Sequence, residues 1–276
     1  MTIVVKIGGG NGVATTNIVR EIAQCVTGGQ RVVVIHGGSE LTNMLSERLG
    51  HRVRMITSPG GMVSRYTDSE TLRIYAMAVA GQINTELVAS LQQLGVNALG
   101  LAGVDGRLLL ARRKSAIRSL MPGGRVQILR DDYTGQIEHV NDTLLCQLLD
   151  SGYIPVIAPL ALSLDGERLN VDGDRVASSV AAALQADVLV IITNVPGLLA
   201  NPEDQSTLIR SIPTHQLADY VHYAHGRMRK KLLAAQEALQ NGVQSVCIGS
   251  NSLLNVLNGS GTVIESLPIH AERNLI

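Results

Sequence analysis

Two glycine-rich turns near the start of the chain combine residue types that suit an anion site. Gly8–Gly10 and Gly37–Gly38 each follow an aliphatic run, and Lys6 lies within the first run. At the carboxyl ends of parallel strands, glycines let backbone N–H groups approach a phosphate closely. Neither turn fits a P-loop or the G-x-G-x-x-G dinucleotide fingerprint. The turns therefore predict an anion site of another kind, to which Lys6 adds a cation; a solvated lysine at a sheet edge is the alternative.

Three later segments add charged and polar side chains to this prediction. Asn170–Asp174 places two carboxylates and an amide just before an Ala-rich helical pattern, and Asp174 taken alone is interpreted as the cap of that helix. Gly226–Lys231 opens another helix with four cations, which oppose the helix dipole and so favour an anionic ligand. Thr193–Gly197 ends an aliphatic run with a turn, again at the edge of a sheet where ligands bind.

The elements that would position these residues alternate between short aliphatic strands and longer helical patterns. This alternation predicts an α/β fold, with an open and mostly parallel sheet covered by helices on both faces. The longest helical pattern runs over Asp68–Leu94, with Asp68 as its N-cap and Gly95 as its C-cap. We expect Leu108–Ala111 and Arg125–Leu129 to form a hairpin around Pro122–Gly124.

The composition excludes several classes of protein. The 276 residues carry 23 basic and 23 acidic side chains, 45% are hydrophobic, and Phe and Trp are absent. Such a chain is too apolar for a disordered protein and too poor in aromatic residues to bind nucleic acid by base stacking. Its three cysteines form no Cys/His cluster, so we predict no metal site. We expect a cytoplasmic protein without membrane or nucleic-acid partners, because neither a signal peptide nor a spanning apolar run is apparent.

Together these segments resemble the amino acid kinase superfamily, and specifically its acetylglutamate-kinase-like branch. The matches follow the family's order over nearly the whole chain and comprise Val5–Gly9, His36–Gly38, Ser64–Asp68, Asn170–Asp174, Thr193–Gly197 and Gly226–Lys231. The resemblance implies a three-layer αβα fold of the carbamate-kinase-like type, with two lobes. It also implies phosphoryl transfer from ATP to a carboxylate, with Mg²⁺ carried mainly by the ATP phosphates and water.

The chain departs from acetylglutamate kinases at three places, and each departure resembles the [LysW]-aminoadipate/[LysW]-glutamate kinases instead. Ser39 replaces a third glycine, Arg65–Asp68 replaces an Arg-Val-Thr type segment, and Arg227–Lys230 replaces an uncharged glycine-rich turn. Arg130–Gly135 and Ala158–Ala161 resemble the same kinases. These enzymes phosphorylate the side-chain carboxylate of an amino acid whose amino group is held by the small acidic carrier protein LysW, in lysine or arginine biosynthesis.

The resemblance assigns roles to the two lobes and to individual residues. Residues 1–172 would bind the amino acid and its carrier and form a homodimer through the long helix, and residues 173–276 would bind ATP. Lys6 and Lys231 would stabilise the transferring phosphoryl group, and Asp174 would orient both lysines; Lys231 is preferred to Lys230 from its spacing to Ala234 and Ala235. Gly8, Gly9, Gly37 and Gly38 would supply N–H donors, Arg65 would hold the α-carboxylate, Asn170 would bond the linking amide, and Thr193, Asn194 and Gly197 would lie near the nucleotide.

A basic stretch between Gly106 and Arg130 supports the carrier interpretation. It holds seven basic residues and no acidic one, whereas the remainder of the chain has 16 basic and 23 acidic residues. A positive hairpin could steer an acidic protein by charge complementarity; protection of a solvated sheet edge is the alternative. We expect the carrier to dock on Arg107, Arg112, Arg113, Lys114 and Arg118.

Two other functions stay open at the level of the sequence. The first is N-acetylglutamate kinase of arginine biosynthesis, which uses a small acetyl group in place of the carrier. The second is a carrier-binding or amino-acid-sensing protein on a kinase fold, against which the set of Lys6, Asp174 and Lys231 argues. Glutamate and aminoadipate differ by one methylene group, which leaves no motif to tell them apart.

Overall fold

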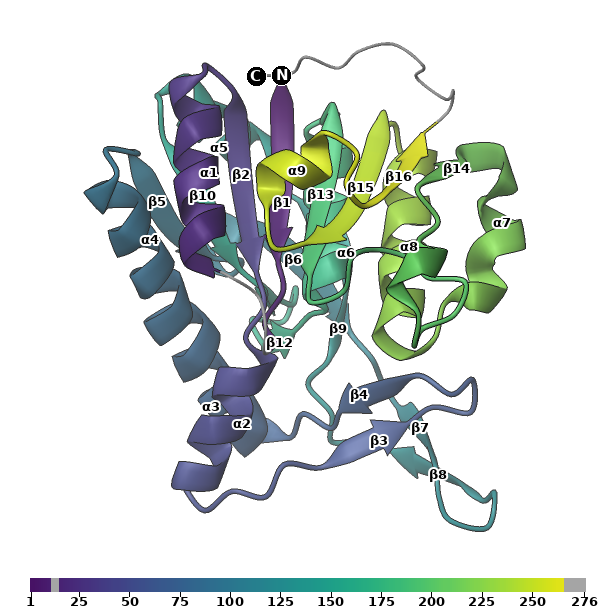
Figure 1. Ribbon diagram of the computed structural model, residues 1–276. Helices are drawn as coiled ribbons and strands as arrows, with labels where there is room; N and C mark the ends of the chain where they lie inside the picture. The colour runs from purple at the N-terminus through teal and green to yellow at the C-terminus, as the bar shows by residue number, and fades with distance from the viewer. Residues whose placement is uncertain (11–14, 266–276) are drawn as a thin grey trace.

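A central sheet of eight strands runs through the computed structural model, which describes residues 1–10 and 15–265 (Figure 1). Its strands are β1 (Thr2–Ile7), β2 (Arg31–His36), β5 (Ala98–Ala102), β10 (Ile154–Ala158), β13 (Val188–Thr193), β14 (Ser211–Pro213), β15 (Ser245–Ser250) and β16 (Thr262–Glu265). They lie in the order β14-β16-β15-β13-β1-β2-β10-β5. All neighbours are parallel except β15 and β16, which confirms the predicted α/β fold with a mostly parallel sheet.

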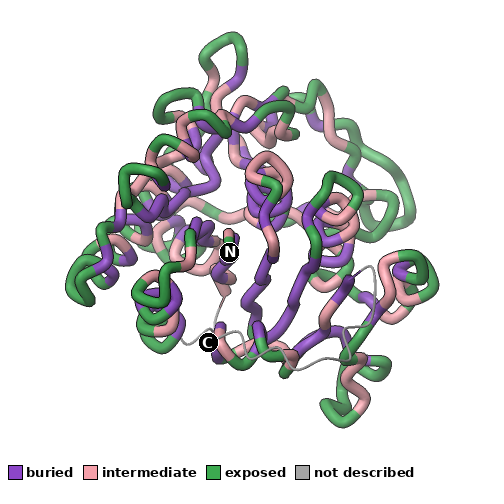
Figure 2. The backbone as a smooth tube through the Cα atoms, turned by 90° about the horizontal axis from the view of Figure 1, so that it is seen from above, coloured by how far each residue is buried: buried purple, intermediate pink, exposed green. Residues whose placement is uncertain are grey.

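Helices cover both faces of this sheet, so the molecule has three layers. One face packs on α5 (Asp142–Asp150), α6 (Gly173–Ala183) and α8 (Gly226–Gln240), and the other packs on α1 (Thr15–Thr27), α4 (Asn84–Gln93) and α9 (Leu253–Leu257). Successive strand residues point to opposite faces. Val4 accordingly packs in the cluster with α6, whereas Ile3 and Val5 pack in the cluster with α1. The residues of the central strands are mostly buried, and many of the outer turns are exposed (Figure 2).

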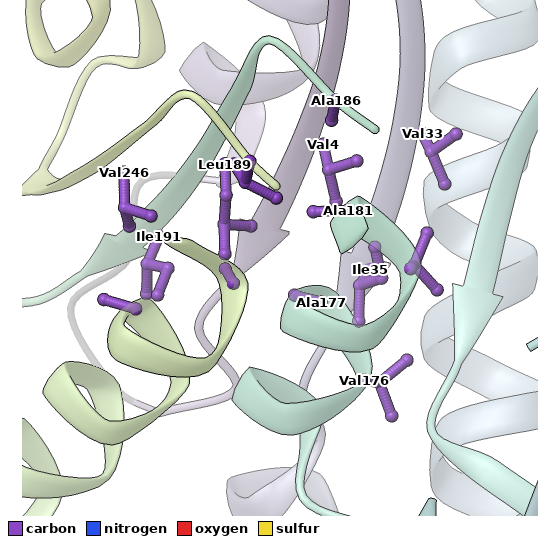
Figure 3. Packing of buried hydrophobic residues seen from close by; sticks show 14 of the residues in the cluster. Val4, Val33, Ile35, Val176, Ala177, Ala181, Ala186, Leu189, Ile191 and Val246 are labelled. Atoms are coloured by element: carbon purple, nitrogen blue, oxygen red, sulfur yellow. The ribbon is translucent and has the colours of Figure 1, made fainter. Parts of the chain in front are cut away.

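Aliphatic and small residues fill the core in place of the missing Phe and Trp. Ala177 and Ala181 of α6 face Val4 and Ile35 of the sheet (Figure 3). All four are fully buried. Alanines let the helix approach the strands closely, and the branched side chains fill the remaining space at the density of a protein interior. This packing holds α6, and with it the start of that helix, rigidly against the sheet.

The long helix predicted over Asp68–Leu94 contains a feature that its periodicity does not indicate. It consists of α3 (Ser69–Ala76), a π-helical segment (Met77–Ile83) and α4. Asp68 caps it as expected, since the carboxylate accepts from the Thr71 N–H at 2.8 Å. Gly95 follows the helix with φ at 78°, the left-handed conformation expected of a C-terminal cap.

The predicted hairpin between Leu108–Ala111 and Arg125–Leu129 is wrong. The turn at Pro122–Gly124 joins β7 (Ile117–Leu120) to β8 (Val126–Leu129). β6 (Leu109–Arg113) instead belongs to a four-stranded sheet with β9 (Gly135–Val140), β11 (Leu160–Leu162) and β12 (Arg168–Asn170). Ile117–Leu120 contains Arg118 and Ser119 and has no aliphatic run, so the sequence pattern did not predict it as a strand.

Two of the remaining elements, α2 (Ser39–Arg48) and the hairpin of β3 (Met55–Thr57) and β4 (Val63–Arg65), lie beyond the carboxyl ends of β1 and β2 (Figure 1). The short helix α7 (Leu217–Tyr220) lies beside β14 at the edge of the sheet (Figure 1). The lobe boundary that we propose between residues 172 and 173 falls between β12 and α6, and the central sheet takes strands from both sides of it. No helix within residues 1–10 and 15–265 is long and apolar enough to cross a membrane.

Candidate active site

A large cavity opens at the carboxyl ends of β1, β2 and β13, with a volume of about 1390 Å³. Its walls contain every residue to which the sequence assigned a catalytic, phosphate-binding, substrate-binding or nucleotide-binding role. These are Lys6, Gly8, Gly9, Gly37, Gly38, Arg65, Asn170, Asp174, Thr193, Asn194, Gly197 and Lys231. A pocket for one small-molecule ligand typically measures roughly 300–1,000 Å³. The cavity therefore has room for two substrates side by side.

Two lysines from distant parts of the chain share one carboxylate in this cavity. Lys6 Nζ lies 2.8 Å from Asp174 Oδ1, and Lys231 Nζ lies 3.0 Å from Asp174 Oδ2. All three residues are at least 93% buried. Burial by itself raises the pKa of Asp174, but the two lysines hold it well below its usual range. Burial and the charge of Lys6 lower the pKa of Lys231, and the Asp174 carboxylate opposes that shift.

The sequence alone suggested that Asp174 caps α6, and this interpretation is wrong. Asp172 takes that place, since its carboxylate accepts from the N–H groups of Asp174 at 2.9 Å and Arg175 at 3.4 Å. Asp174 is thus free to point inward from the first turn of the helix to the lysines. The cluster carries two cations for one anion, so one positive charge remains to be balanced within a nearly dry site.

The two glycine turns pack directly against each other. A Cβ on Gly9 would lie 2.2 Å from the backbone nitrogen of Gly38, so only glycine permits this approach. The N–H of Gly8 donates to Ile192 O at 3.0 Å and that of Gly37 to Ile7 O at 2.9 Å, which extends the sheet. Within the described residues, no carbonyl accepts from the N–H of Gly9 or Gly38. Of the four glycines predicted as donors, Gly9 and Gly38 are therefore the two whose N–H groups remain for a ligand.

Arg65 and Asn170 lie on the side of the cavity formed by β4 and β12. Arg65 Nη2 donates to Ser39 O at 2.8 Å, while Nη1 is buried without a partner in the part of the chain that the structure describes. Burial lowers the pKa of Arg65. Because guanidinium remains charged in proteins, this unpaired buried nitrogen calls for an anion. Asn170 Nδ2 donates to Thr67 Oγ1 at 3.0 Å.

The end of β13 and the following turn form the opposite side. Thr193 is buried, Asn194 is exposed, and both line the cavity. Gly197 has φ at 155°, and a Cβ there would lie 2.5 Å from Thr262 Oγ1. A side chain at this position would thus displace the turn that bounds the cavity.

The basic stretch divides into two groups. Lys114 and Arg118 are exposed and line the cavity. Arg112 instead pairs with Glu138 at 2.7 Å, and Arg113 pairs with Glu167 at 2.7 Å and lies over the Tyr133 ring. Arg107 is exposed at φ 51° and does not line the cavity. Acidic residues from later in the chain therefore neutralise part of the positive charge of the basic stretch.

The structure also brings together polar side chains to which the sequence assigned no role. His36 Nδ1 lies 3.0 Å from Gly37 O, and Asn84 Nδ2 donates to His36 Nε2 at 3.1 Å. Burial lowers the pKa of His36 to about 4, so the ring is neutral at physiological pH. Lys230 Nζ donates to Val63 O at 2.9 Å and so links α8 to the β3–β4 hairpin. Nothing in the local sequence around Asn84 or Lys230 predicts these contacts, because their partners are far away in the chain.

Comparison with known proteins places this geometry in a family. The model of the amino acid kinase family matches residues 1–250. The chain is 43% identical to the [LysW]-aminoadipate kinase of Thermus thermophilus over 95% of this chain and 99% of that protein. It is 44% identical to the [LysW]-aminoadipate kinase of Deinococcus radiodurans over 95% of this chain and 91% of that protein. It is also 36% identical to the acetylglutamate kinase of Methanopyrus kandleri over 95% of this chain and 99% of that protein.

Solved structures show the same fold. The N-acetylglutamate synthase of Neisseria gonorrhoeae, complexed with coenzyme A and N-acetyl-glutamate, superposes with a TM-score of 0.77 at 26% identity. That match covers 97% of this chain and 60% of the other. The carbamate kinase of Giardia lamblia bound to AMP-PNP superposes with a TM-score of 0.69 at 16% identity, over 96% of this chain and 98% of the other. The predicted three-layer fold of the carbamate-kinase-like type is thereby confirmed.

Proposed function

This chain belongs to the amino acid kinase family, and from that premise we propose that it phosphorylates the side-chain carboxylate of 2-aminoadipate or glutamate carried on LysW. It is an ATP-using phosphotransferase of amino-acid biosynthesis with a carboxyl group as acceptor. The family and the names of its relatives leave no room for the non-enzyme alternative. The substrate, the carrier and the metal belong to the proposal.

The cluster of Lys6, Asp174 and Lys231 is the observation that carries the proposal. Its surplus positive charge lies in the cavity, next to the free N–H groups of Gly9 and Gly38. A carboxylate oxygen of the acceptor would attack the γ-phosphorus, the bond to ADP would break, and an acyl phosphate and ADP would leave. The nucleophile is already ionised, so the protein has to overcome repulsion between two anions. Fixed cations and N–H donors in a dry site do this without a general base.

The cavity fits ATP with its metal ion. The turns around Gly9 and Gly38 would hold phosphate oxygens, and Thr193, Asn194 and Gly197 would lie beside the nucleoside. The described residues contain no group of three or more His, Cys, Asp or Glu side chains that could hold a metal ion. As the family resemblance implies, Mg²⁺ would be carried mainly by the ATP phosphates and water, and it would add positive charge where the phosphates converge.

The carrier and the dimer are further parts of this proposal. Lys114 and Arg118, exposed at the mouth of the cavity, would attract the acidic carrier while its amino acid reaches the unpaired nitrogen of Arg65. Arg107, Arg112 and Arg113 would contribute at longer range. The long helix would form the homodimer interface, in which the 45% exposed Met77 would be covered. The relatives that carry LysW in their names support the choice of partner. A cytoplasmic location is part of the same proposal.

A hydroxamate-trapping assay tests the proposal directly, because hydroxylamine captures the acyl phosphate. The acceptors are LysW-linked aminoadipate, LysW-linked glutamate and free N-acetylglutamate. We expect turnover with a carrier-linked acceptor and weak turnover with the free one. Mass spectrometry of the trapped product identifies the amino acid.

Acetylglutamate kinase is the second candidate, favoured by the 36% identity to the Methanopyrus kandleri enzyme. The site itself does not distinguish an acetyl group from a carrier on the α-nitrogen. Efficient turnover of free N-acetylglutamate, with no gain when LysW is attached, would establish this candidate in place of the first.

A further inference from the structure

Thr67 joins three separate segments at the acceptor side of the cavity, although it has no exposed surface of its own. Its N–H donates to Asp132 Oδ2 at 2.9 Å, and its carbonyl accepts from the Tyr133 N–H at 2.7 Å. Its hydroxyl donates to Arg65 O at 3.3 Å and accepts from Asn170 Nδ2 at 3.0 Å. All the polar groups of Thr67 are therefore engaged, and two of the partners are the residues expected to hold the acceptor.

The hydroxyl determines which way the Asn170 amide faces. A hydroxyl has one proton, and that of Thr67 points to Arg65 O. Toward Asn170 the same oxygen accepts, and Asn170 presents its Nδ2 group to Thr67 at 3.0 Å. Asn170 lines the cavity, and its Oδ1 is then left for a ligand that donates an N–H.

Asp132 holds Thr67 in this orientation. The fully buried carboxylate accepts from the N–H of Thr67 at 2.9 Å, from the N–H of Thr134 at 2.9 Å and from the hydroxyl of Thr134. The N–H of Asn170 also donates to Tyr133 O at 2.9 Å. The segments around residues 67, 132–134 and 170 are thus joined in one hydrogen-bonded network.

We propose that Thr67, fixed by Asp132, is a positioning residue that selects acceptors whose α-nitrogen carries an acylated N–H. It sets Asn170 Oδ1 as the acceptor for that N–H and fixes the backbone of Arg65, whose free Nη1 receives the α-carboxylate. This inference rests on the proposed function and deepens it. It assigns the recognition of the linking amide to one atom, and it assigns the orientation of that atom to a residue that touches no substrate.

Three variants test the positioning role. Thr67→Val keeps the shape and removes the hydroxyl, Thr67→Ser keeps the hydroxyl, and Thr71→Val is the matched control. Thr71 is also buried, and among the residues that the structure describes its hydroxyl bonds the His51 ring alone, at 2.8 Å. We expect Thr67→Val to raise KM for the acceptor about tenfold with KM for ATP unchanged, because only the acceptor meets Asn170. Thr67→Ser and Thr71→Val should keep both KM values within about twofold.

A second experiment changes the substrate instead of the protein. The N-acyl acceptor is compared with its ester analogue, in which oxygen replaces the N–H. The wild type should prefer the amide about tenfold in kcat/KM, because the ester oxygen cannot donate to Asn170 Oδ1. Thr67→Val should lose most of that preference, since its Asn170 is free to turn.

The outcomes separate this inference from the proposed function. A wild type that uses amide and ester equally well overturns the inference even if Thr67→Val does not fold. An unchanged KM of Thr67→Val for the acceptor also overturns the inference. The same holds if Thr67→Val and Thr71→Val lose stability to the same extent and neither changes KM. A wild type that neither binds the N-acyl acceptors in calorimetry nor phosphorylates them overturns both the inference and the proposed function.

Discussion

Two groups of basic residues in this protein, the lysine pair at Asp174 and the basic stretch of residues 107–130, use positive charge in opposite ways. Lys6 and Lys231 come from distant parts of the chain, share one carboxylate and are at most 6% exposed. The cations of the basic stretch are close in sequence, but Arg112 and Arg113 pair with separate acids, while Lys114 and Arg118 line the cavity without an acidic partner among the described residues.

The difference shows that the function of a cation depends on its burial, and on whether it shares its carboxylate with another cation, more than on the number of charges nearby. In the dry cluster, a fixed charge acts strongly on a transferring phosphoryl group and costs no reorganisation. At the surface, water and salt screen each charge, so it contributes mainly to the rate at which a charged partner arrives. Four experiments test this contrast, from the largest expected effect to the smallest.

Removing the lysine on α8 should have the largest effect. Lys231→Ala should lower kcat about 10³-fold in the hydroxamate assay, because one of two fixed cations is lost from the transition state. Arg229→Ala, two residues earlier in the same helical turn, is the control and should change kcat less than about twofold; it is exposed and does not line the cavity. A similar loss in both variants would mean that general charge, and not the cluster, drives catalysis.

Removing the shared carboxylate should affect stability more than removing a surface partner. Asp174→Asn leaves two buried lysines without their anion and should lower the free energy of unfolding by about 3 kcal/mol. Glu138→Gln breaks the exposed pair with Arg112 and should cost less than about 1 kcal/mol. Denaturant titration measures both values. Equal losses would contradict the contrast between buried and surface charge.

The burial of His36 next to the glycine turn should make the free energy of unfolding depend on pH. His36 has a pKa of about 4 in the folded state, below the usual value of 6.5. The unfolded chain therefore binds a proton that the folded chain does not. Stability should fall as the pH decreases from 6.5 toward 4, by up to about 1.4 kcal/mol per pH unit. His36→Gln should flatten this slope, whereas His215→Gln, at an exposed position, should not. An unchanged slope in His36→Gln would show that other groups cause the acid sensitivity.

The smallest effect is expected at the cavity mouth. Replacing Lys114 and Arg118 together by alanine should raise KM for the carrier-linked acceptor about fivefold at low salt, and the difference should disappear at high salt. Arg112→Ala should change KM less, because Glu138 already neutralises that charge. KM for ATP is the internal control. A larger effect from Arg112 than from the free pair would place the docking surface on the outer strands.

Much of the fold and of the candidate site follows from local patterns. Aliphatic runs give the strands of the central sheet, and the short side chain of Asp68 gives the start of the long helix. The glycine turns and Lys6 could be assigned to the cavity because strand ends of a parallel sheet meet at one edge. The pairing of the strands was harder to predict. β6 pairs with β9 and β11, which are far away in the chain, whereas the sequence pattern favoured the nearby segment Arg125–Leu129.

The chemistry of the site depends on contacts that no local pattern encodes. Asp174 looks like a helix cap in the sequence, but Asp172 caps the helix and releases it to face Lys6 and Lys231. The π-helical segment and the contact between His36 and Asn84 are equally invisible, because both depend on how the long helix lies against the sheet.

The sequence by itself determined the fold class, the edge of the sheet at which the site lies, and the types of residue that gather there. These follow from periodicity and from the conformations that glycine allows. Only the tertiary structure decided whether Asp174 caps its helix or faces the lysines, which of the predicted glycine donors lack a partner, and which cations of the basic stretch are already neutralised. Hydrogen bonds and ion pairs act over a few ångströms in space, and the residues that make them here are far apart in the chain: Lys6 and Asp174, for example, are separated by 168 positions.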